Sequence, residues 1–236
     1  MEISVSKSDL LKELTATQGV VERKTTIPIL SNFLFEATGD KLLITATDLD
    51  LSLRTSCPAK IKKEGSGTIP ARKLYDYVKL LGEGDISIKL LENHWVQIRS
   101  GRSNTKMVGM ARANFPALPQ FPAESIPLPA PVLRNLIART IFSISNEESR
   151  YTLNGALLVL KPDSITMVAT DGHRLAHIEH NNSKLPVSGE IKVLVPKKAM
   201  SELNTLLNSA DIQVVDFAKD ESTLFFRIGG RLLTSR

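Results

Sequence analysis

Apolar residues recur along this chain at two spacings, and each spacing occurs in both halves. A spacing of three to four residues marks one face of an amphipathic helix over Lys7 to about Thr17, and again over Pro131 to about Ile144. A second helix in each half is predicted after Pro70 to about Leu81, and after Pro196 to about Leu207. The chain therefore contains two pairs of predicted helices.

Between these helices, short apolar or alternating runs predict strands. Turn residues such as Thr38-Gly39-Asp40 separate neighbouring runs. The last two predicted strands of each half are joined by a short polar turn, which predicts a β-hairpin. The predicted strands are 29–36, 41–47, 49–56, 85–91, 94–100, 211–218 and 222–228.

The two halves also match each other residue by residue, in the same order and at a slowly rising offset. Five short matches in one order indicate an internal repeat of about 120 residues. The matches include Leu30–Phe35 with Leu153–Leu158, Ala46–Asp48 with Ala169–Asp171, Ile69-Pro70 with Val195-Pro196, Asp85-Ile86 with Asp211-Ile212, and Gly101-Arg102 with Gly230-Arg231.

The repeat predicts an α+β fold of two similar domains, each with two helices packed on antiparallel sheets. We expect the first domain at 1–115 and the second at 131–236. Residues 116–130 lie between them in a proline-rich segment, which predicts an extended linker.

Composition narrows the class of protein. The chain has 236 residues, 42% of them hydrophobic, and a single cysteine, Cys57, so no internal disulfide framework is expected. No apolar run reaches the roughly 20 residues of a membrane span, and the first residues lack an apolar signal-peptide core. A protein of a reducing compartment with no membrane partner is predicted.

The net charge of +5 is concentrated on the predicted helices. Counted over 6–18, 71–82, 131–144 and 197–209, they carry nine basic and four acidic residues. Basic helices without a base-reading motif favour contact with phosphates, which is independent of sequence. Aromatic residues are only 5% of the chain, which provides few stacking platforms.

Candidate catalytic chemistry is sparse. Neither a phosphate-binding glycine loop nor a nucleophile motif is present. His173, His177 and His180 have helical metal-site spacing, but their segment is predicted as a strand after an Asp-Gly turn. Asp48 and Asp171 occupy equivalent places in the repeat, which predicts a shared role in capping a turn. No catalytic residue, metal or cofactor is therefore expected.

The turn at Asp171 differs chemically from its counterpart. The first repeat has Leu49-Asp50-Leu51 where the second has Gly172-His173-Arg174. Leu153 and Leu175, with the stems of Arg150 and Arg174, are predicted to form a small apolar pocket with a polar rim. Such a pocket suits the hydrophobic anchor of an extended peptide, although ordinary core packing explains the same residues equally well.

Several motifs together resemble one known family, the β subunit of bacterial DNA polymerase III, or β sliding clamp. The matching stretches run through the whole chain and include Pro28–Asn32, Ala46–Leu49, Ile69–Lys73, Ser100–Ser103, Asn114–Pro116, Arg150–Gly155, Val168–Leu175 and Val195–Lys198. The combination of Val168–Leu175 (VATDGHRL) with Arg150–Gly155 (RYTLNG) is specific.

This resemblance implies a DNA clamp, in which repeated domains form part of a ring with helices inside and sheets outside. It implies a non-catalytic processivity factor that encircles duplex DNA and tethers the replicative polymerase. The implied partners are duplex DNA, the polymerase catalytic subunit, the clamp loader and other proteins with clamp-binding motifs. A homodimer in the full-length protein, located in the bacterial cytoplasm at the nucleoid and replication fork, is also implied.

The resemblance and the charge pattern together nominate two sets of residues. The predicted DNA-binding set is Arg23, Lys24, Arg72, Lys73, Arg102, Asn146, Tyr151, Lys197 and Lys198. The peptide-binding set implied by the resemblance is Arg150, Leu153, Thr170, Gly172, His173, Arg174 and Leu175. Thr152 departs from the family pattern, because many relatives have an aromatic residue there.

Relatives in this family have a third domain, and no third repeat occurs here. The second repeat also lacks the counterpart of Met110–Leu118, which predicts that the sequence is a fragment of a longer chain. Two alternatives remain at this stage. One is a trimeric two-domain clamp like the proliferating cell nuclear antigen, and the other is a metal-dependent nucleic-acid enzyme that uses Asp48, Asp171 or His173.

Overall fold

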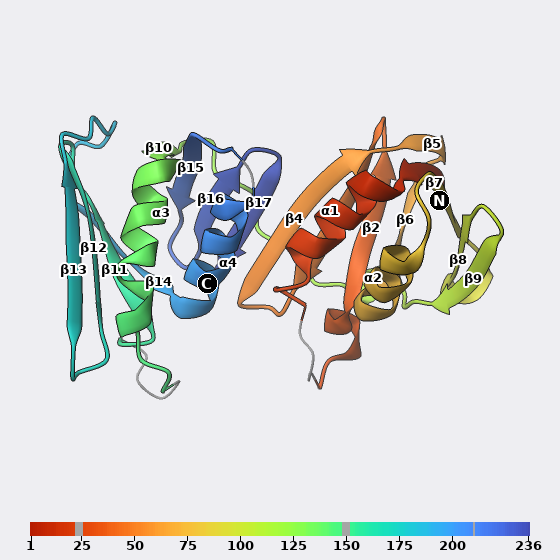
Figure 1. The fold of residues 1–236 in the computed structure, drawn as a ribbon, viewed down its shortest axis with the longest axis horizontal. Coiled ribbons are helices and arrows are strands. Elements are labelled where there is room, and N and C mark those ends of the chain that lie inside the picture. The colour runs from red at the N-terminus through yellow and green to blue at the C-terminus, as the bar shows by residue number, and fades with distance from the viewer. Residues whose placement is uncertain (22–25, 148–151, 210) are drawn as a thin grey trace. The chain divides into compact units, whose positions relative to one another are not determined.

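The computed structural model describes residues 1–21, 26–147, 152–209 and 211–236. It divides into two compact units, Met1–Leu118 and Pro119–Arg236. Each unit contains two helices that lie against antiparallel sheets, as the ribbon in Figure 1 shows for each unit by itself. This confirms the predicted α+β fold and its repeat.

The first unit has two groups of antiparallel strands. One sheet has the order β5-β1-β7-β8-β9, and a second group has the order β4-β3-β2-β6. The strands are β1 Glu2–Ser6, β2 Asn32–Thr38, β3 Lys41–Thr47, β4 Leu51–Pro58, β5 Lys60–Lys63, β6 Gly65–Pro70, β7 Asp85–Leu90, β8 Trp95–Ser100 and β9 Ser103–Val108.

The helices of the first unit are α1, Lys7–Thr17, and α2, Ala71–Leu80. The apolar stripe of α1 includes Leu10 and Leu14, whose side chains are fully buried. The corresponding stripe of α2 includes Leu74 and Val78, also fully buried. Burial of each large apolar side chain in these stripes stabilises the folded unit by roughly 2 kcal/mol. The polar face of each helix is thereby left to solvent.

The second unit repeats this plan. Its sheets have the orders β10-β15-β16-β17 and β13-β12-β11-β14. Its helices are α3, Ala130–Ala138, and α4, Lys197–Asn208, which contact each other. The strands are β10 Ile126–Pro129, β11 Gly155–Leu160, β12 Ser164–Thr170, β13 Leu175–Asn181, β14 Ile191–Pro196, β15 Val214–Lys219, β16 Leu224–Ile228 and β17 Arg231–Ser235.

Several element boundaries differ from the sequence prediction, most of all the end of α3 and the starts of β2 and β15. Helix α3 ends at Ala138 rather than near Ile144, because Thr140 leaves the helical conformation with a φ of −127° and the chain continues as a short 3-10 turn, η4, at Ile141–Ser143. Strand β2 begins at Asn32 rather than residue 29, because Pro28 starts another 3-10 turn, η1, at Pro28–Ser31.

Part of the proline-rich segment 116–130 forms a strand. β10 pairs with β15 through Leu128 opposite Val215, and Leu128 is almost completely buried. Pro127 and Pro129 lack an N–H donor, and β10 tolerates them because no other strand of its sheet lies beyond it. Within the described residues, no helix is long and apolar enough to cross a membrane.

Buried hydrogen bonds join the segment after β9 to β6 in the first unit. The Thr68 hydroxyl accepts hydrogen bonds from the Met110 backbone N–H at 2.8 Å and from the Asn32 amide at 3.1 Å. Gly109 precedes Met110, and a Cβ atom at Gly109 would overlap the Thr68 carbonyl oxygen. A residue without a side chain is therefore required where this segment approaches β6.

We expect Gly109→Ala to destabilise the protein by about 2–4 kcal/mol, because backbone must move to admit the methyl group. The measurement is urea unfolding followed by circular dichroism. Gly82→Ala is the matched control, since a Cβ at Gly82 would meet nothing within 4 Å. Equal stability of the two variants would contradict the close-approach argument.

Candidate nucleic-acid interface and peptide pocket

The predicted peptide-binding turn connects β12 to β13, and its shape is fixed by its own side chains. Asp171 Oδ1 accepts the backbone N–H groups of His173 and Arg174, both at 3.0 Å. The Thr170 hydroxyl accepts the N–H of Gly172 at 3.1 Å and donates to the Arg174 carbonyl at 2.7 Å. The turn is thus held without help from a ligand.

The first unit contains the same turn between β3 and β4. Asp48 Oδ1 accepts the N–H groups of Asp50 and Leu51 at 3.0 and 2.6 Å. The Thr47 hydroxyl accepts from the Leu49 N–H and donates to the Leu51 carbonyl, both at 3.0 Å. This confirms the prediction that Asp48 and Asp171 cap equivalent turns.

The two turns differ in their third residue. Gly172 has a φ of 90°, a conformation that glycine adopts without steric cost. Leu49, its counterpart, has a φ of 85°, which is strained for a residue with a side chain. The second repeat therefore combines the unstrained turn with an exposed His-Arg pair.

Arg174 is held in place by three contacts. Its Nε lies 3.0 Å from Asp171 Oδ2, and its terminal nitrogen donates to the Phe142 carbonyl at 2.6 Å. Its guanidinium carbon also lies 5.7 Å from the centre of the Phe142 ring. Phe142 is 56% exposed and was not nominated from the sequence, because it falls within the segment predicted as helix.

The other nominated pocket residues lie around this turn. Leu175 begins β13 with 65% of its surface exposed, and Thr170 is its partner across the ladder. Leu153 is half-buried and precedes β11, whose first residues lie beside the end of β12 in the antiparallel ladder. His173 is exposed. Arg150 lies outside the described residues.

Hydrogen bonding to Asp171 changes its acidity. The backbone N–H of His173, then that of Arg174, favours the carboxylate and lowers the pKa of Asp171 from 3.8 to about 2. The Arg174 side chain adds a smaller contribution of the same sign. The carboxylate that orders the turn is consequently charged throughout the physiological range.

The structure describes six of the nine predicted DNA-binding residues, in three different places. Arg72, Lys73 and Lys198 are exposed on the first turns of α2 and α4. Lys197 and Asn146 are brought together, because the Lys197 ammonium donates to the Asn146 side-chain oxygen. Arg102 is exposed in the turn between β8 and β9 and is not on a helix. Arg23, Lys24 and Tyr151 lie outside the described residues.

Not every helix cation contributes to a solvent-facing positive surface. Lys7 is 9% exposed and its ammonium lies 3.0 Å from a Glu83 carboxylate oxygen. Arg134 donates to the Leu207 carbonyl at 2.7 Å, whereas Arg139, just beyond the last residue of α3, is exposed and donates its Nε hydrogen to the Asn135 side-chain oxygen at 2.9 Å. The exposed helix cations are therefore mainly Lys12, Arg72, Lys73, Lys79 and Lys198.

The histidines after the turn lie on a strand. His177 and His180 are three residues apart on β13, so their side chains leave opposite faces. Within the part of the chain that the structure describes, no group of three or more His, Cys, Asp or Glu side chains is placed to hold a metal ion.

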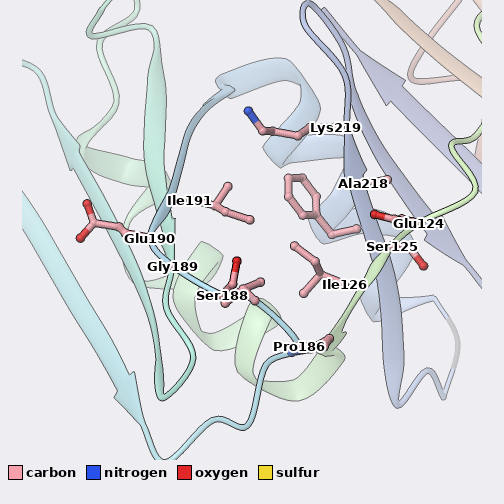
Figure 2. A pocket seen from close by; sticks show the side chains of 12 residues that line it. Glu124, Ser125, Ile126, Pro186, Ser188, Gly189, Glu190, Ile191, Ala218 and Lys219 are labelled. Atoms are coloured by element: carbon pink, nitrogen blue, oxygen red, sulfur yellow. The ribbon is translucent and has the colours of Figure 1, made fainter.

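A separate cavity of about 410 Å³ lies in the second unit, among Glu124–Ile126, Pro186–Ile191 and Phe217–Lys219. Figure 2 shows Ile126 and Ile191 pointing into it from opposite sides, while the Glu190 carboxylate points away. None of the nominated residues lines this cavity. The cavity is therefore separate from the predicted peptide-binding and DNA-binding residues.

The repeated units have the DNA-clamp fold, which defines the class of protein. A sequence model described as the DNA polymerase III beta subunit, N-terminal domain, matches residues 1–119. A second, described as the central domain of that subunit, matches residues 127–236. The chain belongs to the DNA polymerase III β subunit family.

Individual relatives agree. The chain is 35% identical over 238 residues to the beta sliding clamp of Chlamydia muridarum and 37% identical over 243 residues to that of Caulobacter vibrioides. Each match covers 100% of this chain, and 64% and 65% of the respective relative. The chain thus spans about two thirds or less of the length of the relatives that it matches.

Solved structures show the same likeness. The DNA polymerase sliding clamp from Bacillus subtilis superposes with a TM-score of 0.93 at 29% identity. The DNA polymerase III subunit beta from Pseudomonas aeruginosa gives 0.93 at 33% identity. Both matches cover 100% of this chain and 64% of the solved chain.

We expect the Asp171 carboxyl to titrate near pH 2 in an NMR titration, well below 3.8. Because its folded pKa is lowered, its contribution to turn stability is complete above 3.8 and is lost as the pH falls toward 2. Arg174→Ala should retain most of the shift, since the backbone hydrogen bonds are its larger cause. A midpoint at or above 3.8 would show that these bonds do not form.

Proposed function

We propose that this chain forms part of a sliding clamp, a non-catalytic processivity factor that encircles duplex DNA and tethers the replicative polymerase. Membership of the DNA polymerase III β subunit family supports this most directly. The presence of two similar units, each with exposed cations on its helices, agrees with a sliding-clamp function. The same family assignment favours it over a trimeric two-domain clamp.

The helices supply a contact that does not depend on base sequence. Long lysine and arginine side chains on their polar faces reach phosphates while their charged ends stay in water. In this proposal the DNA contacts come from Arg23, Lys24, Arg72, Lys73, Arg102, Asn146, Tyr151, Lys197 and Lys198. Weak, exchangeable phosphate contacts hold the duplex and permit sliding, because no base-specific bond fixes the register.

The pocket supplies the tether. Leu153, Thr170 and Leu175 would receive the apolar side chain of an extended peptide, and Arg150, Gly172, His173 and Arg174 would line its polar rim. The partners are the polymerase catalytic subunit, the clamp loader and other proteins with clamp-binding motifs. The proposed assembly is a homodimeric ring of the natural protein, with three clamp domains in each chain, at replication forks in the bacterial cytoplasm.

Primer extension on a long primed circular template tests this function. The natural protein carrying this chain should lengthen the products of its polymerase per binding event when the clamp loader is present. His173→Ala and Arg174→Ala should each weaken binding of a polymerase-tail peptide by about tenfold, as expected when one contact in a pocket is lost. They should shorten the products accordingly.

Asp50→Ala is the matched control, because Asp50 holds the position of His173 in the equivalent turn of the first unit. It should leave peptide affinity unchanged. Product lengths that do not respond to the natural protein would contradict the clamp function. A normal response combined with unchanged peptide affinity in the His173 and Arg174 variants would contradict only the pocket assignment.

Removal of helix cations should affect duplex binding and leave peptide binding intact. Lys73→Ala and Lys198→Ala should each reduce the steepness of the salt dependence of duplex affinity by about 0.9 in log–log slope, if each contacts one phosphate. Lys41→Ala, an exposed lysine at the start of β3, is the control. Unchanged slopes for both helix variants would remove these residues from the interface.

A further inference from the structure

The five-stranded sheet of the first unit carries a basic surface of its own. Its strands contain six basic residues, all exposed, and two acidic residues, Glu2 and Asp85. Helices α1 and α2 of the same unit contain five basic and three acidic residues. The basic residues of the sheet are Lys60, Lys62, Lys63, Lys89, Arg99 and Lys106. The sheet is thus more positive than the helices.

One aromatic side chain lies on this surface. Trp95 opens β8 and is 43% exposed, whereas Val96 and Ile98 on the same strand are fully buried. Because side chains alternate along a strand, Trp95, Gln97 and Arg99 share the outward face. Trp95 is the only tryptophan in the chain.

The indole forms part of a groove of about 740 Å³. The groove is lined by Lys89, Leu90, Leu91, Glu92, Trp95 and Lys106. In the ladder, Lys89 and Lys106 lie on either side of Gln97. The Lys89 and Lys106 side chains therefore line the same groove as the exposed Trp95 indole.

The carboxylates of the sheet neutralise only part of this charge. Lys62 and Lys89 share Glu2, each with an ammonium-to-oxygen distance of 3.0 Å, and Lys60 lies 3.8 Å from Asp85. Among the described residues, no carboxylate lies within ion-pair distance of Arg99 or Lys106. Glu92 is the one acidic residue in the groove.

We propose that this face binds single-stranded nucleic acid, with one base stacked on Trp95 and the phosphates held by Lys89, Lys106 and Arg99. An aromatic ring beside a basic track is the combination by which proteins hold single strands without sequence preference. Basic side chains lie on four of the five strands and extend beyond the groove, which suits a long polyanion better than a short acidic peptide. This contact is separate from the duplex contact assigned to the helices.

The Trp95 indole makes the proposal directly measurable, because the fluorescence that is lost in the Trp95→Phe variant reports this face alone. Titration of the protein with a twelve-residue oligothymidylate should quench the Trp95 fluorescence, and added salt should reverse the quenching. A duplex of equal length serves as the comparison. It should bind through the helices and leave the fluorescence of Trp95 unchanged.

Variants test the individual contacts, with affinity measured by anisotropy of a labelled oligothymidylate. Trp95→Leu should weaken binding by roughly fivefold to 150-fold, the range for loss of one stacked base. Lys106→Glu should also weaken it, and Glu92→Gln should strengthen it by removing the mismatched charge. Lys184→Glu, an exposed lysine of the second unit, makes the same charge change and should have no effect.

Two results would overturn the proposal. If oligothymidylate neither quenches Trp95 nor loses affinity in the Trp95→Leu variant, nucleic acid does not bind at this face. If a polyglutamate peptide quenches Trp95 as strongly, with the same dependence on Lys106, the face binds an acidic protein segment instead. Circular dichroism of each variant establishes that a loss of binding is not a loss of fold.

Discussion

Burial of one apolar stripe per helix against antiparallel sheets is the constraint on which the rest of this molecule depends. Leu10 and Leu14 on α1, and Leu203 and Leu207 on α4, are almost completely removed from water. Once these faces are buried, the opposite faces must be exposed and polar. The cations at Arg72, Lys73 and Lys198 are thus presented to solvent by the same packing that stabilises each unit.

The repeat shows how one scaffold carries different chemistry in its two copies. The Thr-Asp turn has the same side-chain-to-backbone hydrogen bonds in both units. Since those bonds come from Thr and Asp, the residues that follow are free to change. The first unit has strained Leu49 where the second has Gly172, and only the second exposes the His173-Arg174 pair. The side chains at the turn can therefore change without altering the pairing of the flanking strands.

The exposed positive charge is less concentrated on the helices than the count of basic residues in their sequences indicates. The Lys7 and Arg134 side chains bond to groups within their own units. Exposed lysines on the strands form a second positive surface. Periodicity alone did not reveal this, because the alternation of a strand separates its cations in sequence. They gather only when β1, β5, β7, β8 and β9 lie side by side.

The amino-acid sequence by itself determined the repeat, the α+β class, the bounds of α1 and the capping roles of Asp48 and Asp171. Each of these follows from local spacing or from hydrogen bonds within a few residues. Tertiary structure decided which cations face solvent, the early end of α3, and the contact of Phe142 with Arg174. These depend on residues distant in the chain, and only the folded packing brings such residues together.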